Sequence, residues 1–95
     1  MKFMLSWRLH TEKRHDALKG FSKMTAADDK ADFGKNIRLI GRWHDLAGGT
    51  GVAIIESDDP VAMANYALNW NTVLDATVTP VLDDEETRKL GKSRK

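Results

Sequence analysis

The chain has 95 residues, which is enough for one small domain built around a single hydrophobic core. Its 15 Lys and Arg residues nearly balance its 14 Asp and Glu residues, so the net charge of +1 argues against a nucleic-acid partner and an anionic-membrane partner. Because cysteine is absent, disulfides, thiolate nucleophiles and thiolate-bound metals are excluded.

The first segment, Lys2–Leu9, places Phe3, Leu5 and Trp7 on one side and polar residues between them. This two-residue period predicts a strand. The apolar stretch is too short and too polar for a signal peptide or a membrane span, so we expect a cytoplasmic protein without a membrane partner.

A helix is predicted next, because Thr11 offers a cap and Ala17, Leu18 and Phe21 follow at helical spacing. The stretch after it, Ala26–Asn36, is rich in Asp, Lys, Ala and Gly. We interpret this stretch as a solvated loop into which the helix frays.

A hairpin is predicted in the middle of the chain. Ile37–His44 alternates like a second strand, a glycine-rich turn covers residues 48–51, and the apolar run Val52–Glu56 suits a central strand. Since residues 48–51 join two strands and open no helix, they are typical of a hairpin turn and not of a phosphate site.

A second helix begins at Asp59 and Pro60, an acidic cap followed by proline at the first helical position, and it closes at Trp70. Ala76–Leu82 predicts a fourth strand, and Pro80 within it favours an edge position.

The resulting order, βαββαβ over residues 1–84, predicts an α+β domain of ferredoxin-like topology. We expect a four-stranded antiparallel sheet in the order 4-1-3-2 with both helices on one face. Residues 85–95 place acids before bases and predict a short charged C-terminal helix or a mobile tail.

The face of the sheet away from the helices is predicted to be half apolar. If Trp43 faces the helices with the first strand's aromatics, the open face carries the following residues: Met4, Ser6, Arg8, Arg38, Ile40, Arg42 and His44. Such a face favours a homodimer, as in a dimeric α+β barrel. The alternative is a monomer whose arginine stems cover the apolar strip.

The topology brings the three tryptophans to one end of the sheet, and this end is the predicted ligand mouth. The candidate ligand-binding residues are Trp7, Arg42, Trp43, His44, Trp70 and Asn71. His44 is the candidate for proton transfer, because histidine titrates near neutrality. The alternative is that the indoles only plug the end of a small core. The histidines show no metal-ligand spacing, so neither a metal nor a cofactor is expected.

Short motifs carry a resemblance to a known group. They are Gly41-Arg42-Trp43-His44, Glu56-Ser57-Asp58-Asp59-Pro60, Trp70-Asn71 and Thr79-Pro80-Val81-Leu82. With these motifs the chain resembles a small bacterial family of unknown function in the dimeric α+β-barrel group. More loosely, it is similar to an accessory protein of gene clusters for prodigiosin-type tripyrrole pigments.

The resemblance implies an accessory role in secondary metabolism, in which the protein binds a planar hydrophobic small molecule or assists a pathway enzyme. One alternative is a cofactor-independent monooxygenase, with His44 as base and Asn71 or Arg42 stabilising a developing anion. Another alternative is a protein-interaction module that binds no ligand.

Overall fold

Four strands and four α-helices follow one another along residues 1–94, the part of the chain that the computed structural model describes. They are β1 (Lys2–Leu9), α1 (Arg14–Ser22), α2 (Ala26–Phe33), β2 (Arg38–Asp45), β3 (Thr50–Glu56), α3 (Pro60–Trp70), β4 (Leu74–Val81) and α4 (Asp84–Ser93). A 3₁₀ turn, η1 (Thr11–Lys13), precedes α1, so Thr11 opens this turn and caps no helix with its side chain. None of the helices in residues 1–94 has the length and apolar character needed to cross a membrane.

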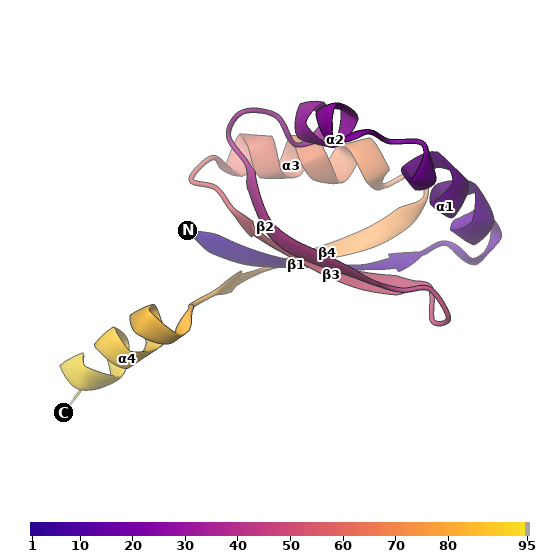
Figure 1. Cartoon of the computed structure of the whole chain (residues 1–95). Helices are drawn as coiled ribbons and strands as arrows, with labels where there is room; N and C mark the ends of the chain where they lie inside the picture. The colour runs from indigo at the N-terminus through magenta and orange to yellow at the C-terminus, as the bar shows by residue number, and fades with distance from the viewer. Residues whose placement is uncertain (95) are drawn as a thin grey trace.

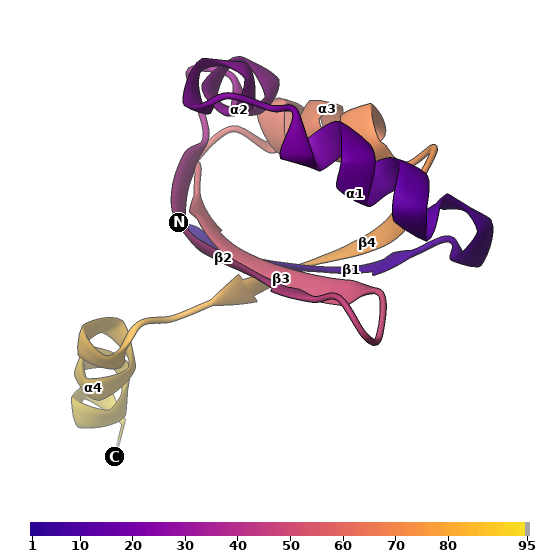
Figure 2. The ribbon, with the colours of Figure 1, turned by 45° about the vertical axis from the view of Figure 1, so that its right-hand side comes forward.

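The strands form one antiparallel sheet in the order β2-β3-β1-β4, which reads β4-β1-β3-β2 from the other edge. Helices α1, α2 and α3 lie over one face of this sheet (Figures 1 and 2). On that face the central strands bury Leu5, Ala53 and Ile55. The α+β class and the four-stranded antiparallel sheet are thereby confirmed.

The stretch Ala26–Asn36, predicted as a loop, contains the helix α2, so that prediction is wrong. Thr25 and Asp28 form a capping box, in which the Thr25 hydroxyl accepts from the Asp28 backbone N–H at 3.1 Å. The Asp28 carboxylate accepts from the Thr25 N–H at 3.0 Å. Hydrogen bonding of this carboxylate to Thr25, first of all to its backbone N–H, lowers the pKa of Asp28. At its other end α2 buries Phe33, whose ring stacks on Tyr66 at 4.4 Å. The capping box and this one buried aromatic ring stabilise a helix in a stretch whose polar composition is typical of a loop.

Strand β2 carries an irregularity that reverses its faces. Leu39 pairs with Ile55, but Gly41 pairs with Ile54, so one extra residue, Ile40, lies between two otherwise regular pairings. Because side chains alternate along a strand, an extra residue moves every later side chain to the opposite face.

The bulge overturns the predicted facing of the Arg42-Trp43-His44 segment. Arg42 pairs with Ala53 and so faces the helices together with His44, whereas Trp43 faces away from them. The Trp43 side chain is 60% exposed. Its ring lies over Gly41, where a Cβ atom would overlap it. The open face therefore gains an indole and loses two of its predicted polar groups.

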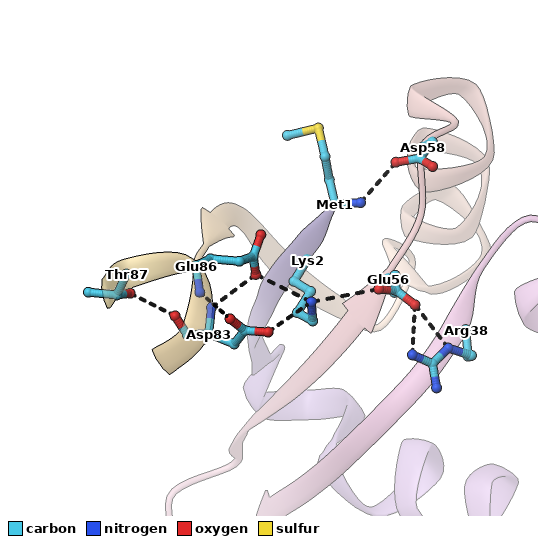
Figure 3. A network of polar contacts seen from close by, with 8 residues as sticks. All are labelled: Met1, Lys2, Arg38, Glu56, Asp58, Asp83, Glu86 and Thr87. Carbon is cyan, nitrogen blue, oxygen red and sulfur yellow. Dashed lines mark hydrogen bonds and ion pairs between the residues drawn. The ribbon is translucent and has the colours of Figure 1, made fainter. Parts of the chain in front are cut away.

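The C-terminal helix α4 stands apart from the sheet on the side opposite to the other helices (Figures 1 and 2). Its base is held to β1 by Lys2, whose ammonium lies 3.2 Å from the Asp83 carboxylate and 3.3 Å from that of Glu86 (Figure 3). These two carboxylates raise the pKa of Lys2. Lys2 also lies 3.8 Å from Glu56, which binds Arg38 at 2.7 Å.

Candidate functional site

A cavity of about 310 Å³ opens between the helix-facing side of the sheet and helices α1 and α3. Its wall is mostly apolar and includes Leu5, Trp7, Leu18, Phe21, Trp70 and Leu74. This volume lies at the lower end of the range for small-molecule sites, which are typically apolar with a few polar groups. The titratable lining groups are Arg14, His15, Arg42, His44, Asp45 and Tyr66.

Trp7 and two neighbouring rings form an aromatic wall of the cavity. Trp7 faces the helices opposite Gly51, and a Cβ atom at Gly51 would overlap its indole. Glycine is thus the residue that lets the indole lie across β3. The Trp7 and His44 rings meet edge to face at 5.5 Å, and His44 lies 5.0 Å from Phe21. A planar ring system entering the cavity would meet these rings.

Trp70 lines the same cavity from the end of α3. Its indole N–H donates to the Asp32 carboxylate at 2.6 Å, and Asn69 donates to the other oxygen at 2.9 Å. These bonds tie α3 to α2 and orient the indole. Asn71 is the exposed C-cap residue of α3 and does not line the cavity.

Arg42 also reaches the cavity, but its charge is already neutralised. Its guanidinium donates to both Asp29 carboxylate oxygens, at 3.1 and 2.8 Å, and lies 4.8 Å from the Phe21 ring centre. Burial works against the charged form, but the bonds to Asp29 outweigh it and raise the pKa of Arg42. For the neighbouring Tyr66, burial disfavours the phenolate and raises the pKa to about 12, so this lining residue stays a neutral phenol. Arg42 therefore serves mainly to hold α2 against the sheet.

His44 has a neutral imidazole at neutral pH. Burial, and then the charge of Arg42, lower its pKa below the ordinary value of 6.5. The Asp75 carboxylate is bound to the His10 imidazole, at 3.2 Å, and not to His44. Within residues 1–94, no three His, Asp or Glu side chains are grouped so that they could hold a metal ion.

We expect the titration of His44 to appear in the pH dependence of stability. Its folded-state pKa lies below 6.5, so as the pH falls through 6.5 the unfolded chain takes up the proton first. The free energy of unfolding should therefore fall over the pH range just below 6.5. His44→Asn should flatten this slope in urea denaturation at a series of pH values. An imidazole that titrates above 6.5 by NMR would contradict the assignment.

Arg14 is a lining residue that the sequence patterns did not single out. It begins α1, and its guanidinium lies against Gly49, where a Cβ atom would overlap it. Gly49 has a φ of 69°, a left-handed conformation that favours glycine. Sequence alone offers only a weak signal, the glycine-rich turn facing the start of the first helix.

The predicted mouth is thus assembled in part. Trp7, Arg42, His44 and Trp70 line one cavity. Trp43 lies on the opposite face of the sheet and Asn71 lies outside the cavity, so the three indoles do not form one cluster.

Comparison with known proteins yields one match. The model of a family described as a domain of unknown function (DUF3303) matches residues 1–95. No curated protein and no solved structure matches the chain.

Proposed function

This chain belongs to the DUF3303 family, and we propose that it is an accessory protein that holds a planar, apolar small molecule between its sheet and α1. The observation that carries the proposal is the cavity of about 310 Å³ walled by Trp7, Phe21 and Trp70. Burying apolar ligand surface there would contribute about 25 cal/mol per Å². The resemblance to pigment-cluster accessory proteins supports a place in secondary metabolism, with a pyrrole as the candidate ligand.

Binding is better supported than catalysis. A cofactor-independent oxygenase would need His44 beside a free group that stabilises an anion. Arg42 is committed to Asp29, and Asn71 lies outside the cavity. Neither of the two groups assigned to that role is therefore available beside His44.

Fluorescence titration tests the binding role. We expect dipyrroles or a neutral pyrene alcohol to quench tryptophan emission with a saturable curve, because Trp7 and Trp70 line the cavity. Trp43→Phe is the matched control: it removes an indole from the other face and should leave the dissociation constant unchanged. A response that stays linear with ligand, without saturation, would contradict the proposal.

We further propose that two ferredoxin-like domains pair through their open sheet faces, as in a dimeric α+β barrel. The register places Met4, Trp43, Val52 and Ile54 on that face. An exposed indole beside these apolar side chains is more than a monomer usually presents to water. Sedimentation velocity should give the mass of a dimer, and a monomer at high protein concentration would count against this pairing.

A further inference from the structure

The charged groups that line the cavity do not pair off with one another. Arg42 forms its ion pair with the Asp29 carboxylate. Asp45 is engaged by its own hairpin, since it accepts from the Gly48 N–H at 2.9 Å and from the Thr50 hydroxyl at 3.4 Å. Arg14 has no carboxylate within ion-pair distance among residues 1–94.

The Arg14 side chain is also packed in place, but one of its hydrogen-bond donors has no acceptor in the chain up to residue 94. Its Nε is buried and has no hydrogen-bond partner in the described part of the chain. The guanidinium is packed against the backbone of Gly49, one of the residues that line the cavity. A buried donor left without a partner costs free energy. An anion bound by the other guanidinium nitrogens would supply the counter-charge that Arg14 lacks within residues 1–94.

We propose that the ligand of this cavity carries an acidic head group, a carboxylate or a comparable anion, and that Arg14 binds it while the apolar body contacts the aromatic wall. The guanidinium fork matches the geometry of a carboxylate. The inference rests on the proposed binding function and deepens it. It assigns Arg14 a recognition role and leaves Arg42 a structural one.

Two probes that differ only in their head group test this inference. Pyrenebutyrate carries a carboxylate where pyrenebutanol carries a hydroxyl, and tryptophan quenching reports the binding of both. We expect the wild-type protein to bind the carboxylate about tenfold more tightly than the alcohol, and Arg14→Gln to abolish that preference. Binding of the alcohol should persist, which also shows that the variant is folded.

Lys19→Gln is the matched control, because it removes the same charge from an exposed position of α1 that does not line the cavity. It should keep the preference for the carboxylate. Equal binding of both probes by the wild type, or a preference that survives Arg14→Gln, would overturn the role of Arg14 and leave the cavity intact. Failure of both probes to bind would instead overturn the proposed binding function itself.

Discussion

Replacing Asp29 with alanine is expected to lower the free energy of unfolding by about 2 kcal/mol, because it leaves the partly buried positive charge of Arg42 without a carboxylate partner. The Arg42 side chain is only 14% exposed, and its guanidinium lies 4.8 Å from the ring centre of Phe21 and 5.6 Å from that of Phe33. Neither ring offers a hydrogen-bond acceptor comparable to a carboxylate. Urea denaturation measures the loss, which should appear as a lower midpoint with an unchanged slope.

Two further variants make this test specific. Asp16→Ala removes an exposed acid from the first turn of α1 and should cost only a few tenths of a kcal/mol. Adding Arg42→Met to Asp29→Ala should restore much of the stability, because the stranded charge is then gone. If Asp29→Ala costs no more than Asp16→Ala, the ion pair does not hold α2 to the sheet.

Filling the cavity is expected to have the largest effect on ligand binding. Ala67 lines the cavity from α3, so Ala67→Phe should occupy space that a planar ligand needs. We expect affinity for pyrenebutanol to fall roughly tenfold or more. The neutral probe is chosen so that the result does not depend on Arg14.

Ala64→Phe is the control for this substitution, because Ala64 is exposed on the same helix and does not line the cavity. It should leave pyrenebutanol binding unchanged. If Ala67→Phe binds the probe as well as Ala64→Phe does, the probe binds elsewhere.

The sheet could be predicted because its strands carry strong local signals. Phe3, Leu5 and Trp7 alternate without interruption, and these positions face the helices in the structure. Likewise, Asp59 before Pro60 predicts the start of α3, and the Asp59 side chain accepts from two N–H groups of its first turn.

The bulge in β2 could not be predicted, because one extra residue leaves the apolar pattern of Ile37–His44 almost unchanged. Its consequence is large, since it exchanges the faces of Arg42, Trp43 and His44. Gly41 is the one hint, because glycine within a strand often marks a bulge. The helix α2 was missed for a different reason, as its composition outweighed the capping signal.

The candidate site, like the fold, could be predicted from the sequence only in part. That Trp7 and Trp70 share a cavity follows from topology alone, because β1 and α3 end at the same edge of the sheet. The role of Arg14 depends on a tertiary contact with Gly49, which no periodicity encodes.

The indole signals of the three tryptophans provide the most direct test of a ligand cavity on the helix side of the sheet. In an NMR titration with pyrenebutanol, we predict that the indole N–H signals of Trp7 and Trp70 shift with one common dissociation constant. The Trp43 signal, from the opposite face, should stay in place. Shifts confined to Trp43, or no saturable shift of Trp7 and Trp70, would contradict the account.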